Sequence, residues 1–209
     1  MKLYIMPGAC SMVPHVALEW AKADYELEIL DHGSVKSEEY LRINPQGSVP
    51  AIVDGDTIVT QNIAVQTYID AKYPDANIFG SDSSPAKRAE IMHWLAFINS
   101  DVHKGFGPLF GPDGFVKDKT AQDELKENAK KKIVDLLQYP NEQLGTHDYL
   151  TGTKTTADIY LYVILTWAKK MQLDLSAYEN LNAFISRIES DAGLTEVIRQ
   201  EGISKIESL

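Results

Sequence analysis

Cysteine is almost absent from this sequence. Cys10 is the only one among 209 residues, which excludes an internal disulfide and is typical of a reducing compartment. Long apolar runs are also missing. The densest one, from Ile159 to Ala168, is too short to span a bilayer. The first apolar run ends at Pro7-Gly8, so we expect neither a signal peptide nor a membrane anchor.

Positive charge is scarce as well. The chain has 20 Lys and Arg against 30 Asp and Glu, a formal net charge of −10. Such a balance makes a poor ligand for nucleic acid or anionic membranes, and we interpret the triplet Lys130–Lys132 as solvated surface. The five histidines show no metal-binding spacing. We therefore expect a soluble, cytoplasmic protein that binds no metal, nucleic acid or membrane.

Strand signals are confined to the first third of the chain. There, short apolar runs alternate with short helical patterns, and Asp54-Gly55-Asp56 between two apolar runs is typical of a hairpin. The order β-α-β-α-β-β-α follows. The strands are expected at 2–6, 26–30, 51–53 and 58–60, and the helices at 12–22, 37–42 and 63–71.

Beyond the turn-forming residues near 80, every periodic segment is helical. The segment from Asp158 to Met171 is apolar on nearly all sides and predicts a central buried helix, with a capping box formed by Thr155 and Asp158. We predict an α/β domain at 1–76, a linker at 77–86 and an all-helical domain at 87–209.

Cys10 stands between the first strand and the first helix, for which Ser11 is a plausible N-cap. The N–H groups at a helix N-terminus favour an anion and can lower the pKa of a thiol to between roughly 3.5 and 7.5. The alternative is a buried cysteine that packs as a small hydrophobe. Position alone does not separate the two.

Two further motifs carry polar backbone groups. Val49-Pro50 precedes a strand, and a cis bond there would direct the Val49 N–H and C=O toward the helix that follows Cys10. Gln61-Asn62 begins the third helix, whose first N–H groups can hold a carboxylate. The alternative for the second motif is an ordinary helix cap.

Five motifs together resemble the cytosolic glutathione transferases, most closely their bacterial beta class. They are KLYIMPGACS, NPQGSVPAIV, QNIAVQTYI, DVHKGFGPLF and TTADIYLYVILTWA. The resemblance covers the whole chain. It implies a thioredoxin-like N-terminal domain that binds glutathione, an all-α C-terminal domain, and a homodimer.

The resemblance also implies roles for individual residues in binding glutathione. Val49 would hydrogen-bond its cysteinyl part, with cis-Pro50 setting the geometry. Gln61 and Asn62 would hold the γ-glutamyl carboxylate, and Lys36, with His32 as the substitute, the glycyl carboxylate. Asp101 would reach the γ-glutamyl amine across the dimer interface. The family asparagine seven residues before His103 is Ala96 here, which removes a polar contact.

Close to the glutathione sulfur, the resemblance implies Cys10 from the first domain and His103 from the second. His103 could act as a proton donor or base. Ser11 is a further candidate to stabilise the thiolate, whereas Tyr4 is expected to pack in the first strand. An apolar electrophile pocket is implied between the domains, and Phe106, Phe110 and Trp167 lie in segments that could line it. Packing within the core is the alternative for these aromatic residues.

The function implied is a glutathione transferase that conjugates glutathione to small hydrophobic electrophiles, with no cofactor beyond this co-substrate. Two alternatives stay open. One is glutathione-dependent thiol–disulfide exchange, with Cys10 as the nucleophile. The other is a non-catalytic protein of the same fold that carries ligands or regulates, which Ala96 and Asn62 would favour.

Overall fold

The computed structural model describes residues 1–82, 84–206 and 208–209, and its contacts divide the chain into two units. The first unit comprises Met1–Asp82 with Ile188–Lys205, and the second Ser83–Arg187 with Ile206–Leu209. The sequence analysis placed residues 188–205 in the helical domain, whereas their contacts group them with the first unit. Ser83, within the expected linker, lies outside the described residues.

A four-stranded mixed sheet organises the first unit, with the strand order β2-β1-β3-β4. Strands β1 (Lys2–Ile5) and β2 (Glu26–Ile29) are parallel, whereas β3 (Ala51–Asp54) runs antiparallel to β1 and to β4 (Thr57–Thr60). The turn between β3 and β4 contains Gly55 at φ +60°, a left-handed conformation that suits glycine. The predicted hairpin is confirmed.

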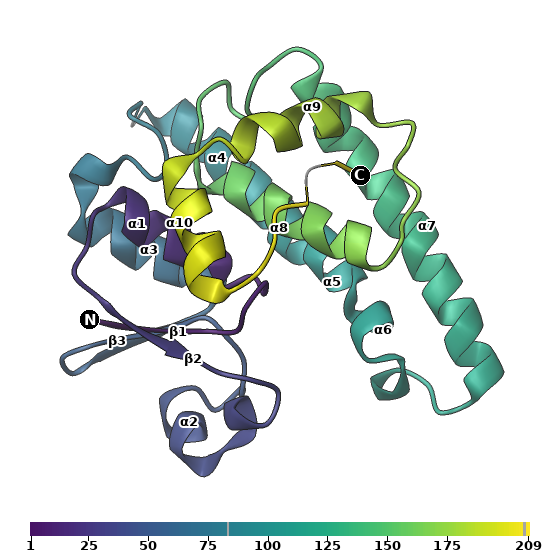
Figure 1. The fold of residues 1–209 in the computed structure, drawn as a ribbon, viewed down its shortest axis with the longest axis horizontal. Helices are drawn as coiled ribbons and strands as arrows, with labels where there is room; N and C mark the ends of the chain where they lie inside the picture. Colours follow the sequence, from purple (N-terminus) through teal and green to yellow (C-terminus); the bar gives the residue numbers. More distant parts are fainter. Residues whose placement is uncertain (83, 207) are drawn as a thin grey trace. The chain divides into compact units, whose positions relative to one another are not determined.

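Helices cover both faces of this sheet (Figure 1). On one face lie α1 (Met12–Trp20) and α3 (Asn62–Lys72), and α10 (Ala192–Glu201) packs against α1. On the other lie the short turn η1 (Ser34–Lys36) and α2 (Glu38–Ile43), over a second apolar cluster that contains Val35 and Tyr40. Leu3 and Ile5 are fully buried while Tyr4 packs against the second cluster, as strand alternation requires.

The order β-α-β-α-β-β-α of the first 72 residues is confirmed, with η1 added before α2 and η2 (Pro74–Ala76) after α3. Helix α10 was not expected there. Its N-cap Asp191 accepts a hydrogen bond from the Trp20 indole Nε1 of α1 at 2.9 Å. This contact and the packing of α10 on α1 explain why α10 belongs to the first unit.

The second unit is helical in its described residues. Its elements are α4 (Pro85–Phe97), the π-helical turn η3 (Ile98–Val102), α5 (His103–Gly105), α6 (Gly107–Phe110), η4 (Pro112–Gly114), α7 (Lys119–Leu144), α8 (Thr156–Lys170) and α9 (Glu179–Ile188). Helix α8 is buried along most of its length, as predicted. Among the described residues, no helix is both long and apolar enough to cross a membrane.

One local prediction in this unit is confirmed. The capping box at α8 is present: the Asp158 carboxylate accepts from the Thr155 N–H at 2.8 Å. The glycine-rich segment after His103 is broken into short helices, and a Cβ on Gly107 would lie 3.1 Å from the Phe115 ring. Glycine there allows a close approach that a larger residue would obstruct.

Candidate functional site

Cys10 lies between a tight turn and α1. The turn is closed by the Ala9 N–H, which donates to the Met6 carbonyl at 3.0 Å. Ser11 follows, and its hydroxyl accepts from the Met6 N–H at 3.1 Å and donates to the Met6 carbonyl at 3.3 Å. Ser11 is the N-cap residue of α1, as predicted, but its side chain makes no capping hydrogen bond and instead ties the helix start to the end of β1.

The Cys10 thiol is 9% exposed, and burial raises its pKa to about 11, although a hydrogen bond from Asn62 and the backbone N–H offset part of the effect. The thiol is therefore protonated near neutral pH. Its S–H donates to the Val49 carbonyl, with Sγ and O 3.6 Å apart. The sequence left a lowered pKa and a buried, hydrophobe-like cysteine both open, and here burial outweighs the helix N–H groups.

The loop that carries Val49 is held in place by α2 and the residue after it. The Ser48 carbonyl accepts from the Tyr40 hydroxyl at 2.6 Å and from the Asn44 amide at 2.7 Å. The bond between Val49 and Pro50 is cis. Tyr40 and Asn44 received no role from the sequence, since their link to Ser48 depends on how α2 folds back on the loop.

The N-terminus of α3 lies beside Cys10. Gln61 is the N-cap residue, with φ 75° and ψ 128°, a conformation that non-glycine residues seldom adopt. Such backbone outliers cluster at functional sites. Its side-chain amide donates to Gln46 rather than capping the helix.

Asn62 is 5% exposed, and its amide group donates to the Cys10 carbonyl at 2.6 Å and accepts from Gln66 at 2.6 Å. These two bonds commit the Asn62 side chain to holding Cys10. Its backbone N–H, at the first turn of α3, is then the group that can face a carboxylate.

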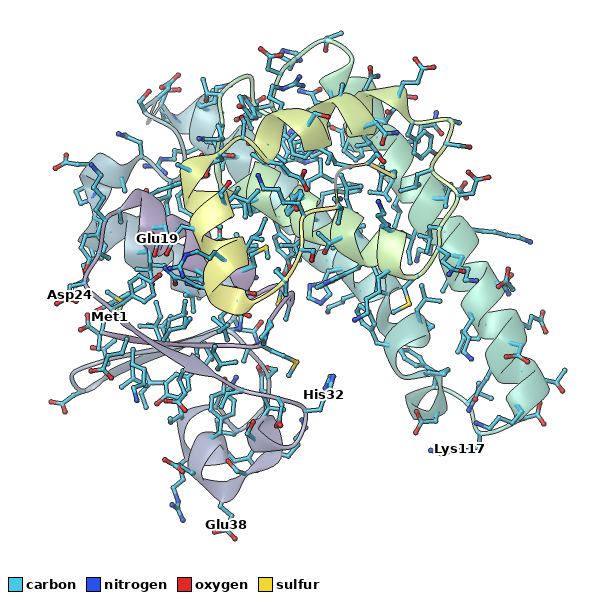
Figure 2. The ribbon with its side chains drawn as sticks, viewed as in Figure 1. Met1, Glu19, Asp24, His32, Glu38 and Lys117 are labelled. Carbon is cyan, nitrogen blue, oxygen red and sulfur yellow. The ribbon has the colours of Figure 1, made fainter. Side chains whose placement is uncertain are left out.

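The two candidates for the glycyl carboxylate lie near the turn η1. The Lys36 ammonium donates to the Gly47 carbonyl at 2.9 Å, which ties it to the loop that leads to Val49. His32 is exposed and projects outward from the loop after β2 (Figure 2). Of the two, Lys36 is closer in the structure to the Val49 loop.

In the second unit, His103 is held by side chains. Its Nδ1 lies 2.7 Å from the Tyr160 hydroxyl, which itself donates to the side-chain amide oxygen of Asn99 at 2.9 Å. Because the hydroxyl proton goes to Asn99, His103 donates through Nδ1–H and keeps a lone pair on Nε2. Burial, assisted by Lys104, lowers the pKa of His103 to about 4, so the ring is neutral near pH 7.

The three aromatic residues predicted for the electrophile pocket contact one another. Ring centroids are 5.5 Å apart for Phe106 and Trp167, 5.3 Å for Phe110 and Trp167, and 5.8 Å for Phe106 and Phe110. The His103 ring lies 4.7 Å from Trp167. Phe106 is fully buried, whereas Phe110 is 52% exposed. The cluster therefore extends from the buried core at Phe106 to the surface at Phe110, and it contacts His103 through Trp167.

Asp101 and Ala96 are both exposed, on η3 and α4. Sequence reasoning gave no role to Asn99 or Tyr160, the partners of His103. Tyr160 belongs to one of the quoted motifs, so its polar tip on an otherwise apolar helix was an available signal.

Comparisons with known proteins agree over nearly the whole chain. Residues 1–71 match the model of the glutathione S-transferase N-terminal domain, and residues 91–192 that of the C-terminal domain. A glutathione S-transferase of Xanthomonas campestris, GST-4.5, is 38% identical over 98% of this chain and 100% of its own.

Solved structures show the same likeness. The glutathione S-transferase from Xylella fastidiosa has a TM-score of 0.92 at 42% identity, covering 97% of this chain and 99% of its own. The bacterial beta class enzyme of Sphingomonas chungbukensis has a TM-score of 0.85 at 33% identity, covering 98% of this chain and 100% of its own.

Proposed function

This chain belongs to the glutathione S-transferase family, and we propose that it conjugates reduced glutathione to small hydrophobic electrophiles. The single observation that carries the proposal is the contact between the Cys10 thiol and the Val49 carbonyl at 3.6 Å, beside the N-terminus of α3. It brings a thiol, a peptide-like acceptor and a carboxylate-binding helix end together within the first unit.

Each part of glutathione then meets a group of matching chemistry. The Val49 backbone pairs with the cysteinyl peptide groups, and the first N–H groups of α3 receive the γ-glutamyl carboxylate. The geometry of Gln61 supports this use of the helix end, because its side chain is turned aside toward Gln46. Lys36 offers the cation for the glycyl carboxylate.

The protonation state of Cys10 determines its role. A thiol with a pKa of about 11 is not the attacking thiolate near pH 7. When the cysteinyl N–H of glutathione takes the Val49 carbonyl, the S–H of Cys10 loses its acceptor and can donate to the glutathione sulfur. We therefore assign Cys10 to stabilising the glutathione thiolate, and Ser11, whose hydroxyl is bonded to Met6, to supporting the turn.

The reaction follows from these assignments. The glutathione thiol loses its proton to solvent, its sulfur forms a bond to an electrophilic carbon, and the leaving group departs with the electron pair of the broken bond. For the electrophile, the helical unit offers the apolar cluster of Phe106, Phe110 and Trp167. Neutral His103, with a lone pair on Nε2, adds a proton acceptor at the edge of that cluster.

We further propose that the protein works in the cytoplasm as a homodimer, with no cofactor beyond glutathione, and that Asp101 acts on the γ-glutamyl amine of the partner's glutathione. The exposure of Asp101 supports this use. Sedimentation analysis of the wild-type protein and of Asp101→Asn, with glutathione affinity measured for both, tests the two statements separately.

Titration calorimetry with reduced glutathione and steady-state conjugation of 1-chloro-2,4-dinitrobenzene test the function directly. We expect wild-type protein to bind glutathione and turn over. Cys10→Ala should lose one hydrogen bond of about 1 kcal/mol, roughly fivefold in kcat/KM.

Other outcomes separate the alternatives. Thiol–disulfide exchange requires Cys10 as nucleophile, so complete loss of turnover in Cys10→Ala, together with glutathione-dependent reduction of a mixed disulfide by the wild type, would replace conjugation with exchange. Absence of glutathione binding in the wild type would leave a non-catalytic member of the family.

A further inference from the structure

A carboxylate on the last helix contacts the turn that precedes Cys10. Pro7 and Gly8 occupy the centre of this turn, with Gly8 at φ +70°, an arrangement that directs the Gly8 N–H away from the turn. That N–H donates to Oε2 of Glu201, on α10, at 2.8 Å. The contact joins residues 193 positions apart within the first unit.

The other oxygen of the same carboxylate contacts α1. Oε1 of Glu201 lies 2.9 Å from Nδ1 of His15, and neither side chain is exposed at all. His15 lies on α1, after Cys10, whereas Gly8 precedes Cys10. A single carboxylate therefore bridges the segments on the two sides of the thiol.

The second ring nitrogen of His15 also has a hydrogen-bond partner. Gln200 turns its amide nitrogen toward Glu19 at 3.1 Å and Glu196 at 2.9 Å, so its oxygen faces Nε2 of His15 at 2.8 Å. Both ring nitrogens of His15 therefore face side-chain oxygens, Nδ1 that of Glu201 and Nε2 that of Gln200. Glu19 lies beside α10, the yellow helix of Figure 2.

A buried charge is costly unless it is paired and fully hydrogen-bonded. Both oxygens of the Glu201 carboxylate have such partners, because one accepts from the Gly8 N–H and the other lies 2.9 Å from Nδ1 of His15. Helix α10 is also fixed laterally: a Cβ on Gly193 would lie 2.6 Å from the Trp20 ring, and Asp191 accepts from the same indole. Both contacts oppose movement of α10 along α1, and they therefore help to fix the position of the Glu201 carboxylate.

We propose that Glu201, supported by His15, is a positioning residue for Cys10. It fixes the turn through Gly8 and the helix through His15, and so sets the position of Sγ beside the Val49 carbonyl, where the proposed function places the glutathione sulfur. The catalytic part of this proposal rests on the proposed function, whereas the effect on the Cys10 thiol does not.

The test compares Glu201→Gln with Arg199→Gln. Glutamine has nearly the shape of glutamate but must oppose an NH₂ group to one of the two donors, Gly8 N–H or His15. Arg199 lies on the same helix in an exposed ion pair with Glu196, so its substitution disturbs α10 and leaves both contacts of the Glu201 carboxylate in place. For each protein, we would measure the folded fraction, the alkylation rate of Cys10 by iodoacetamide, and kcat and KM for glutathione.

We expect Glu201→Gln, in its folded fraction, to alkylate several times faster at Cys10, since a loosened turn exposes the thiol. Its kcat/KM for glutathione should fall about tenfold or more, because misplacement of a reacting group is costly. Glu201→Asp keeps the charge but is shorter, so it should recover part of both values. Arg199→Gln should match the wild type.

A purely structural role for Glu201 would lower thermal stability and leave both the alkylation rate and kcat/KM of the folded protein unchanged, and this result overturns the proposal. If Glu201→Gln does not fold, hydrogen exchange of the Gly8 amide in the wild type decides: exchange as fast as in an open turn overturns it, and strong protection supports it. A wild type that does not act on glutathione would refute the proposed function, while the alkylation rates still test the positioning of Cys10.

Discussion

The two units contain the two candidate reactive groups and hold them by different means. In the first unit, Cys10 is placed mainly by backbone groups, the Met6–Ala9 turn and the Val49 carbonyl, and one side chain, Asn62, donates to its carbonyl. In the second, His103 is placed by side chains of α8 and η3, Tyr160 and Asn99. Both groups are buried enough to be neutral near pH 7, the thiol with its pKa raised and the imidazole with its pKa lowered.

In the proposed reaction, neither of these two groups offers the glutathione thiolate a fixed positive charge. A neutral thiol can donate one hydrogen bond to the glutathione sulfur, and a neutral imidazole can accept a proton. Neither adds a permanent charge that would have to be desolvated when an apolar electrophile binds. Single substitutions can test whether each unit holds its reactive group in the way described.

The largest effect should come from Asp158, which anchors the start of α8 and so supports Tyr160. Its buried carboxylate accepts from Leu150 N–H, Thr155 N–H and the Thr155 hydroxyl. Asp158→Ala should leave several buried donors unsatisfied and cost about 3 kcal/mol or more of the free energy of unfolding. Urea denaturation measures it. Asp118→Ala, an exposed N-cap on α7, should cost only about 1 kcal/mol.

A loss of no more than the Asp118→Ala value in Asp158→Ala would show that α8 does not depend on its capping box. The arrangement of His103 would then need a different support.

A smaller effect is expected in the first unit, where α10 approaches Trp20. Gly193→Ala places a Cβ 2.6 Å from the indole ring and should destabilise by about 1–3 kcal/mol. Gly114→Ala, where no described atom lies within 4 Å, is the matched control. If both variants unfold at the same urea concentration, α10 does not pack on α1 as closely as described.

The pH dependence of stability should separate the two buried groups of the helical unit. The folded state keeps His103 neutral down to about pH 4, while the unfolded chain protonates it below its ordinary value of 6.5, so stability falls as pH decreases through this window. Asp158 acts in the opposite direction: burial raises its pKa to about 6, so the folded state takes up the proton first and gains stability as pH falls from about 6 toward 3.8.

His103→Gln should therefore reduce the loss of stability on acidification, and Asp158→Asn should increase it. Urea midpoints at about pH 7 and about pH 5 check both slopes. Equal slopes in all three proteins would contradict the burial of these groups.

Much of the fold could be predicted from local patterns, and the limits lie where contacts are distant in sequence. The alternation of strand runs, the Asp54-Gly55-Asp56 turn and the Thr155–Asp158 capping box are local, and each is confirmed. The division of the chain into two units could not be predicted from local patterns, because residues 188–205 group with the first unit. Helix α10 contacts α1 through residues more than 170 positions away in the sequence. Its two ends could have been predicted, since Asp191 is a typical N-cap residue and Gly202 a typical residue after a helix C-terminus.

The site shows the same limit. The family resemblance named Cys10, Val49, Gln61 and His103 as candidate site residues. The protonation states of Cys10 and His103, however, depend on burial, which local sequence does not give. The position of Cys10 at a helix N-terminus left a lowered pKa and a buried thiol both open, and the surrounding core raises the pKa. His15 was considered only as a metal ligand, because its partner Glu201 is 186 positions away.

The most direct test of a neutral Cys10 is its alkylation rate as a function of pH in the wild-type protein, with mass spectrometry to count the modified chains. Since only the thiolate reacts, a pKa of about 11 predicts a rate that rises about tenfold per pH unit from about pH 6 to about pH 9, with no plateau. A plateau reached near pH 7 would mean that the helix N-terminus outweighs burial, and Cys10 would then be the nucleophile.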